Sequence, residues 1–491
     1  MKIILDTNIL IHIEDPKELP QNLQALLKIL RKYGHQLFIH FASLRDVNND
    51  PNSERRRITL SKIRGYPILE SPPKPGSEFL ARVGKISKFN DEVDNQILFA
   101  LYKDVADFLI TEDKGIHEKA GMIGLDDRVL SIDSALEYFS KLHERILPTH
   151  ISLRKEPVYN LDINDPFFTP LKQDYPKFEG WFEKISRAGR PCWNYRDESG
   201  LIGALLILKE EEEPILTSRP LPLKRRLKIC TLKVDLSGTK FGELFLKIAF
   251  QYCVDNNISE VYLTHYHKEG NALSYLLESF GFGIAGILED KEEVYLKSLL
   301  PSENNLQSAN LIEYYPCYRD DEGVKKFLVP VRPKYHDRLF PDYQPRQYRL
   351  TEPFEINIPG NAIRKAYLSH SKTKKISQGD VLLFYRSHNH GRVTSIGVVE
   401  QTSHTNDSDK VLRFIGQRSV YSQKEVEDLA KKQVLAILFT HNLNLPTPLA
   451  LNYLREHGII QFAPQSIMEI QHNQYKEIIK GGGIDERFTL H

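Results

Sequence analysis

The chain has 491 residues, of which 41% are hydrophobic and 27% charged, and its net charge is +1. Because one core holds roughly 100–200 residues, we expect three domains. Because the charge is balanced, any nucleic-acid contact has to be local. There is no apolar run of the roughly 18 residues that span a membrane, Asp6 interrupts the apolar stretch that a signal peptide needs, and four distant cysteines form no CxxC pair. These features predict a cytoplasmic protein without a disulfide framework or a zinc site.

Residues 1–145 alternate strand and helix patterns, which is typical of a parallel sheet covered by helices. The expected elements are strand 3–5, helix 23–30, strand 36–40, helix 94–102, strand 107–110 and helix 134–142. The first strand delivers Asp6 to the carboxyl edge of the sheet, where open α/β sheets bind their ligands.

Four aspartates stand near the ends of these elements, namely Asp6, Asp46, Asp94 and Asp113. Carboxylate oxygens are the ligands that Mg²⁺ prefers, and two such ions can drive phosphodiester hydrolysis. We expect the four to converge. Each also has a plainer explanation: Asp6 as a loop residue, Asp46 in a capping box, Asp94 and Asp91 at a helix N-terminus, and Asp113 in a turn.

The segments Leu5-Asp6-Thr7-Asn8, 94–100 and 109–115 resemble, in order, the motifs of PIN-domain nucleases. The resemblance implies a ribonuclease that holds Mg²⁺ or Mn²⁺ with Asp6, Asp94 and Asp113, with Asp46 as a further catalytic acid. Thr111 and Asp91 would assist the metal. Free nucleases of this family are often toxins, so a toxin or defence role and an antitoxin or regulatory partner are implied as well.

A local basic cluster, Arg55, Arg56 and Arg57, follows the second expected strand. It could hold RNA phosphates beside the acids. A solvated helix face explains the same run equally well.

Residues 146–300 form the second expected domain. Its proline-rich start, near 146–170, is expected to be a linker, and the acids Glu210–Glu213 are expected to form a turn. The other expected elements are strand 201–208, strand 229–234, helix 241–255, strand 260–265, helix 271–279 and strand 294–297.

The order of elements over 229–282 resembles the GNAT acyltransferases, whose domain is α+β. The resemblance implies binding of acetyl-coenzyme A by Gly238, Lys240, Gly242 and Asn271. Glycines at such a turn let backbone amides approach a pyrophosphate. The tyrosine that the family uses as a general acid falls on Leu277, which leaves either a catalyst or a scaffold open.

Residues 301–491 form the third expected domain. A basic helix is expected over 361–368, strands over 381–386 and 395–400, and a helix over 449–456. The two strands resemble the PUA-like small β-barrels of the ASCH and EVE type, which implies recognition of RNA or a modified base. Tyr367, Tyr385 and Arg386 are the candidate contacts, although strand aromatics more often belong to a core. His336, His388 and His390 are expected in loops.

The whole chain is thus expected to be a multidomain α/β protein, with a PIN-like parallel α/β/α sandwich, a GNAT-like α+β domain and a PUA-like barrel. The leading hypothesis is a metal-dependent endoribonuclease whose C-terminal domain selects the RNA. The alternative is an acetyltransferase acting on RNA, aminoacylated RNA or protein, with the N-terminal fold as a binding module. A non-enzymatic RNA-binding regulator is the third hypothesis.

Overall fold

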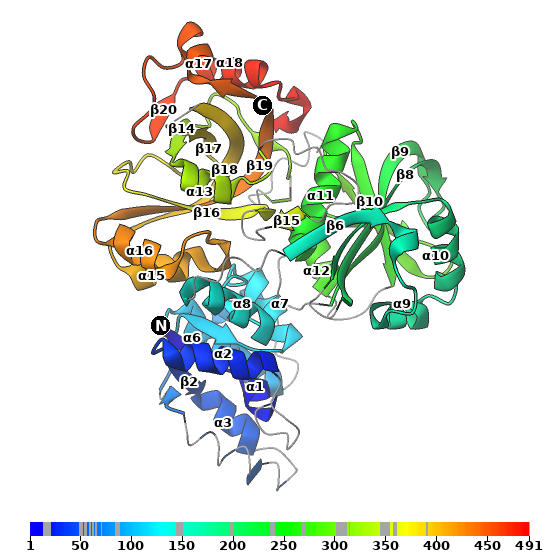
Figure 1. Ribbon diagram of the computed structural model, residues 1–491. Coiled ribbons are helices and arrows are strands. Elements are labelled where there is room, and N and C mark those ends of the chain that lie inside the picture. Colours follow the sequence, from blue (N-terminus) through cyan, green and yellow to red (C-terminus); the bar gives the residue numbers. More distant parts are fainter. Residues whose placement is uncertain are drawn as a thin grey trace.

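The computed structural model describes residues 1–12, 21–48, 66–69, 71–83, 89–143, 151–196, 200–235, 241–266, 272–300, 315–343, 354–356, 361–388 and 391–490, with positions 53, 56, 57, 60, 63, 312 and 313. Figure 1 shows an N-terminal part below, a central part at the right and a C-terminal part above. Within the described residues, no helix has both the length and the apolar character needed to cross a membrane.

The N-terminal part is built on a five-stranded sheet with the order β3-β2-β1-β4-β5. All of its strand pairs are parallel. The strands are β1 (Lys2–Leu5), β2 (Gln36–His40), β3 (Ile68–Leu69), β4 (Phe108–Ile110) and β5 (Val129–Leu130). The expected parallel α/β architecture is confirmed, and β1 ends directly before Asp6 as predicted.

Two helical layers cover the two faces of this sheet, because successive side chains of a strand point in opposite directions. Ile3 and Leu5 pack in one cluster with α2 (Gln21–Lys32) and α8 (Ile132–His143). Ile4 packs on the other face, in a separate cluster. That cluster draws on α5 (Ser77–Val83), α6 (Phe89–Tyr102) and α7 (Lys114–Met122), while α1 (Thr7–His12) and α3 (Phe41–Asn48) follow β1 and β2.

The central part is an eight-stranded sheet with the order β11-β12-β10-β9-β8-β7-β6-β15. Its strands are β6 (Ile151–Pro157), β7 (Pro191–Arg196), β8 (Ile202–Ile215), β9 (Leu221–Val234), β10 (Glu260–Tyr266), β11 (Gly283–Ile287), β12 (Glu292–Ser298) and β15 (Phe354–Ile356). Its helices are α9 (Thr169–Asp174), α10 (Phe178–Arg187), α11 (Phe241–Asp255) and α12 (Ala272–Ser279). Only the pair β9 and β10 is parallel among its described pairs.

Two predictions for this part were wrong. The expected linker at 146–170 contains β6, two short 3₁₀ turns and the start of α9. The expected turn at Glu210–Glu213 lies inside β8, opposite a basic stretch of β9, where Glu212 faces Arg225 and Glu213 faces Lys224. Opposite charges across an antiparallel ladder stabilise it, so the acids belong to a long hairpin.

The C-terminal part has a six-stranded mixed sheet with the order β16-β19-β18-β17-β14-β20. The strands are β14 (Lys326–Val331), β16 (Arg364–Ser369), β17 (Val381–Arg386), β18 (Arg392–Thr405), β19 (Val434–Ala450) and β20 (Met468–Ile470). A two-stranded sheet joins β13 (Tyr318–Arg319) to β21 (Thr489–Leu490). The helices are α13 (Pro333–Leu339), α15 (Ser408–Ile415), α16 (Gln423–Ala430), α17 (Leu451–Glu456) and α18 (His472–Gly482).

The expected basic helix at 361–368 is wrong, because residues 364–369 form strand β16. Ala366 and Leu368 pack toward the N-terminal part, while Tyr367 packs into the core of the C-terminal sheet. A strand buried on both faces lacks the polar alternation that identifies strands in a sequence. His336 also departs from expectation, since it lies in α13, fully buried, and not in a loop.

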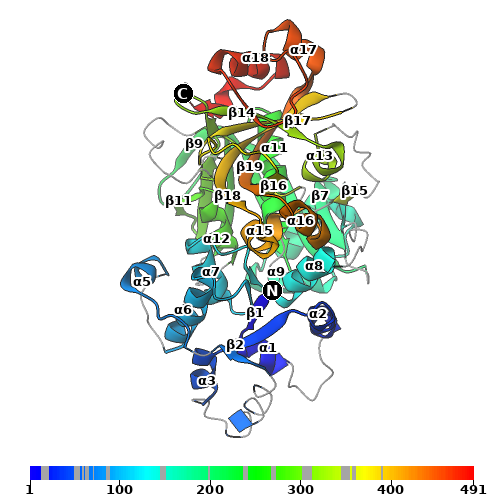
Figure 2. The ribbon, with the colours of Figure 1, turned by 90° about the vertical axis from the view of Figure 1, so that its left-hand side faces the viewer.

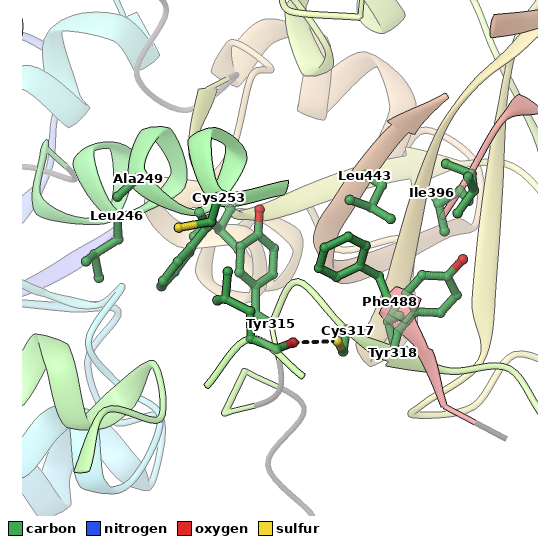
Figure 3. Packing of buried hydrophobic residues seen from close by; sticks show 14 of the residues in the cluster. Leu246, Ala249, Cys253, Tyr315, Cys317, Tyr318, Ile396, Leu443 and Phe488 are labelled. Atoms are coloured by element: carbon green, nitrogen blue, oxygen red, sulfur yellow. Dashed lines mark hydrogen bonds between the residues drawn. The ribbon is translucent and has the colours of Figure 1, made fainter. Parts of the chain in front are cut away.

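One hydrophobic cluster continues from the central part into the C-terminal part. Figure 3 shows Tyr315, Cys317 and Tyr318 lying between residues of α11 and residues such as Leu443 and Phe488. The Cys317 thiol donates to the carbonyl of Leu299 at 2.8 Å. Residues 315–318 therefore belong to a hydrophobic core that the two parts share. Strand β15 links the parts further by pairing with β6. The predicted boundaries at 145 and 300 remain predictions.

A partly buried arginine, Arg364, joins all three parts. The backbone amide of Arg364, in β16, donates to Glu243 of α11 at 2.7 Å, and its guanidinium lies 3.0 Å from Asp126 of the N-terminal part. Burial alone would lower the pKa of Arg364, but the carboxylates of Asp126 and Glu243 raise it well above its usual value.

We expect Arg364→Met to destabilise the protein by about 3 kcal/mol, because the buried carboxylate of Glu243 would lose its partner, while the partly exposed Asp126 would lose less. Urea unfolding followed by circular dichroism measures the change. The matched control is Arg82→Met, which removes an exposed ion pair with Glu78 and should shift stability by less than about 0.5 kcal/mol. Equal stabilities of the two variants would contradict this view of the junction.

Candidate functional site

A threonine hydroxyl ties two strand ends together at the carboxyl edge of the N-terminal sheet. Asp6 follows β1, and Thr111 follows the neighbouring strand β4. The Thr111 hydroxyl donates to Asp6 Oδ2 at 2.6 Å, and the other carboxylate oxygen accepts from the Thr7 amide at 2.7 Å. Both side chains are nearly buried, with 7% of Asp6 and 0% of Thr111 exposed. The position of the Asp6 carboxylate is therefore fixed by the sheet.

The same hydroxyl receives two further hydrogen bonds. Asn8 Nδ2 donates to it at 3.1 Å, and the backbone amide of Asp113 donates at 3.0 Å. Asp113 itself caps α7, accepting from the Ile116 amide at 3.1 Å, while its side chain stays exposed. Thr111 thus links Asp6 to the backbone of Asp113, and Asp113 is the N-cap of α7 and not part of the turn that its sequence context suggested.

Two more acids come from α6. Asp94 lies in the second turn of this helix, which begins at Phe89, so it does not serve as an N-terminal cap. The ammonium of Lys119, on α7, lies 3.1 Å from Asp91 and 3.8 Å from Asp94. Burial, followed by the nearby Asp113 carboxylate, raises the pKa of Asp94 to about 7, with smaller contributions from Asp6 and Asp91.

This arrangement brings together Asp6, Asp94, Asp113, Thr111 and Asp91. Among the described residues, no group of three or more acid, histidine or cysteine side chains is close enough to hold a metal ion. Asp46 lies in α3, and its side chain is outside the described set. The donor chemistry nevertheless fits a hard divalent cation, because the acids supply only oxygen ligands and repel one another.

The basic cluster is only partly described. Arg55 lies outside the described residues, whereas Arg56 is half-buried and Arg57 is exposed. The assignment of these arginines to RNA remains a prediction.

The central sheet opens between its two parallel strands. β9 and β10 pair only through Leu227 with Val261 and Lys228 with Tyr262. Beyond these pairs β9 stays with β8 as far as Val234, and β10 stays with β12 as far as Tyr266. The two strands therefore part on the side from which the chain leads to α11.

Of the residues predicted to bind the cofactor in the central part, the structure describes only Gly242. Gly238, Lys240 and Asn271 lie outside the described residues. Gly242 stands in the first turn of α11, where an added Cβ would come within 2.6 Å of Leu276 on α12. Close packing of two helices thus accounts for this glycine. Leu277, at the place of the family's tyrosine, is fully buried.

Tyr175 and His265, which the sequence did not single out, lie close together near the end of β10. The Tyr175 hydroxyl lies 3.4 Å from His265 Nδ1, and its ring lies 5.2 Å from that of Tyr266. Burial, followed by the charge of Glu292, raises the pKa of Tyr175. Because Tyr175 precedes this strand by 85 residues or more, spacing gave no signal for the pair.

The aromatic candidates of the C-terminal part lie in its core. Tyr385 is 1% exposed and Tyr367 is 7% exposed, with its hydroxyl on the Pro330 carbonyl. Neither ring offers a free face to a base, so the proposal that Tyr385 stacks on RNA is wrong for this structure. Arg386 forms two hydrogen bonds with Asp337, at 2.8 and 3.0 Å, so a phosphate would have to compete with that carboxylate.

Asn8 and Lys119 also lie beside the acidic cluster (Asp6, Asp91, Asp94 and Asp113), although no pattern in the sequence singled them out. Asn8 belongs to the first motif, and its amide is within reach of Thr111 because α1 starts directly after β1. Lys119 lies on the helix that Asp113 caps, so it returns to the acids after the second turn. An amide or lysine at such a spacing is too common to be singled out from one sequence.

Comparisons with known proteins give structural likenesses only. No family model matches the chain, and no curated protein matches it. An ASCH protein from Zymomonas mobilis covers 32% of this chain and 94% of its own, with 12% identity and a TM-score of 0.24. A GNAT acetyltransferase from Staphylococcus aureus covers 30% and 99%, with 14% identity and a TM-score of 0.22. The PaiA N-acetyltransferase from Thermoplasma acidophilum, in complex with coenzyme A, covers 30% and 97%, with 13% identity and a TM-score of 0.22.

The raised pKa of Asp94 gives a prediction for stability. The folded protein keeps this proton up to about pH 7, whereas the unfolded chain loses it near the usual value of 3.8. Stability therefore falls as the pH rises between these two values. Asparagine does not ionise, so Asp94→Asn avoids this decrease in stability. Above pH 7 its free energy of unfolding should exceed that of the unmutated protein by on the order of 2 kcal/mol.

The difference should fade as the pH approaches 4. Urea unfolding in EDTA at pH 4.5, 6 and 8 measures it, and Asp409→Asn, at an exposed site on α15, serves as the control. A stability difference that is the same at all three pH values would rule out the proposed repulsion.

Proposed function

We propose that the acids at the carboxyl edge of the N-terminal sheet form the centre of a metal-dependent ribonuclease. The observation that carries the proposal is the hydrogen bond from Thr111 to Asp6, because it fixes one buried carboxylate beside the N-cap residue Asp113. Asp6 accepts hydrogen bonds from a hydroxyl and from a backbone amide, and neither donor brings a positive charge that would neutralise the carboxylate. Phosphodiester hydrolysis is the reaction that such an oxygen-rich site serves best.

Each residue of the site would have a separate role in the reaction. Asp6, Asp94 and Asp113 would hold Mg²⁺ or Mn²⁺, with Asp46 as a further acid. When bound, such an ion supplies a Lewis acid and lowers the pKa of a coordinated water. Thr111 orients Asp6, and Lys119 limits the repulsion between Asp91 and Asp94. The arginines Arg55, Arg56 and Arg57 would hold the phosphates of the RNA beside the acids.

The position of the site in the molecule supports an external, polymeric substrate. The C-terminal part contacts the loops that precede β4 and β5, through Asp107 and Asp127. These loops lie at the opposite edge of the sheet from Asp6 and Asp113. Figures 1 and 2 show α1 and α3, which follow β1 and β2, on the side that faces away from the other parts. An RNA strand could therefore approach the acids without displacing a domain.

The test is cleavage of total cellular RNA by the purified protein with Mn²⁺. We expect discrete cuts from the unmutated protein and none from the double variant Asp6→Asn/Asp94→Asn. Thr111→Val should slow cleavage by about 10–100-fold, because the carboxylate loses its orienting donor, whereas Thr111→Ser should restore most of the rate. Equal cleavage by the unmutated protein and the double variant would place any nuclease outside these acids.

Acyl transfer from acetyl-coenzyme A is a second candidate function, favoured by the register of the central sheet. β9 and β10 part after a short parallel contact, directly before the segment that leads into α11. Parted strands leave backbone amides and carbonyls without ladder partners, which an extended pantetheine chain could satisfy. Tyr175 and His265 lie near the open end and would supply hydrogen bonds or proton transfer to an acceptor. GNAT acetyltransferases are also among the structural likenesses reported above.

Calorimetry with acetyl-coenzyme A separates the two candidates. We expect saturable binding that Asp6→Asn leaves unchanged, and a several-fold loss of affinity in Lys240→Ala if this lysine contacts the pyrophosphate. Tyr175→Phe should retain the binding and lower any transfer to an acceptor. Absence of binding in the unmutated protein would remove the second candidate and leave the first untouched.

A further inference from the structure

The ammonium group of Lys119 contacts two acids of the neighbouring helix α6. Lys119 Nζ donates to Asp91 Oδ1 at 3.1 Å and lies 3.8 Å from Asp94 Oδ2. Asp91 and Asp94 are three residues apart on α6, so they share one face of that helix. The side chain of Lys119 is 14% exposed, against 26% for Asp91 and 20% for Asp94. The lysine is thus a built-in counter-ion that is more shielded from water than the acids it contacts.

Helix packing holds this lysine in place. Ile116 and Ala120 of α7 are buried in the hydrophobic cluster that also contains Ile97 and Leu98 of α6. Lys119 comes three residues after Ile116 and directly before Ala120, so it stands on the side of α7 that packs toward α6. The apolar contacts therefore position the ammonium group independently of the ion pair.

The acidic cluster has two groups of carboxylates. Asp6 and Asp113 follow strands β1 and β4 and are linked through Thr111, whereas Asp91 and Asp94 come from α6. Asp94 is influenced by Asp113 and Asp6 as well as by Asp91 and Lys119, so it stands between the groups.

A pair of divalent ions would need both groups of acids. Two-ion hydrolysis places its ions about 4 Å apart, each with oxygen ligands. An ion held by Asp91 and Asp94 would have to share their oxygens with the ammonium of Lys119. Like charges at such distances repel strongly in a partly buried site.

We propose that Lys119 takes the place of a second metal ion, so that the acidic cluster binds a single divalent cation through Asp6, Asp94 and Asp113. The inference rests on the proposed ribonuclease centre and specifies how many ions it holds. A lysine ammonium is a compact charge with three hydrogen-bond donors, and it is present in every molecule without having to be recruited. Asp91 pairs with Lys119 and is not a metal ligand.

Titration of the metal-free full chain with Mn²⁺ at pH 8, followed by electron paramagnetic resonance, tests the proposal. We expect one bound ion in the unmutated protein and in Lys119→Arg, which keeps the charge. Lys119→Met should bind two ions, with the exchange-coupled spectrum of a pair about 4 Å apart. Lys114→Met removes an exposed charge from the same helix, so it is the matched control and should bind one.

Asp91→Asn keeps the test valid if Lys119→Met unfolds. It should change the affinity for the single ion by less than about tenfold, because the residue acts on the metal only through Lys119. Two ions in the unmutated protein, one ion in folded Lys119→Met, or a larger loss of affinity in Asp91→Asn would each overturn the proposal.

The same titration separates this inference from the proposed function. Absence of Mn²⁺ binding by the unmutated protein would overturn both the metal centre and the role of Lys119. A protein that binds one ion and cleaves no RNA would count against the ribonuclease alone, because the number of bound ions is measured without a substrate.

Discussion

The relative placement of the three parts depends on two arginines, the partly buried Arg364 and the buried Arg418, and on the acids that surround them. Arg364 contacts Asp126 and Glu243, and Arg418 contacts Asp127 and Glu400. A buried ion pair contributes little net stability, because desolvation offsets the attraction between the charges. A buried charge without its partner is strongly destabilising. A sliding or rotated arrangement would leave charges unpaired. The junction thus selects one docking arrangement among many that would bury similar apolar area.

That choice decides which edge of the N-terminal sheet contacts the C-terminal part. The four aspartates at the junction (Asp104, Asp107, Asp126 and Asp127) stand in the loops that precede β4 and β5. Parallel strands have all their carboxyl ends at the opposite edge, so the junction leaves that edge free of its own contacts among the described residues. The acids at the two edges have different surroundings. Those at the junction pair with arginines, whereas Asp94 at the other edge is influenced by Asp113, Asp6 and Asp91 as well as by Lys119. The acids at the second edge therefore disfavour one another's charged form.

The sequence predicted best where a signal is local. The first strand and Asp6 follow from a short apolar run, and their places in a parallel sheet follow from the alternation of elements. Its predictions were wrong where the conformation of a segment depends on residues that are distant in the sequence. β16 is buried on both faces and shows no period, and the acids of β8 were taken for a turn because their partners on β9 come later in the chain. The helix expected to begin at Asp94 starts earlier, at Phe89, and the coupling of Asp94 to Asp6 and Asp113 depends on folding.

The same limit explains the aromatic residues of the C-terminal part. Tyr385 and Arg386 are neighbours in the sequence, and as neighbours on a strand they point to opposite faces. One therefore enters the core while the other reaches Asp337 at the surface. A pair of adjacent residues on one strand cannot share one nucleic-acid face, so the proposed recognition of RNA by this part would need side chains that alternate along a strand or come from separate elements. The residues that line the cavity between the N-terminal and C-terminal parts, such as Asp127, Glu400 and Lys410, come from separate elements. Because they are far apart in the sequence, only the fold brings them together.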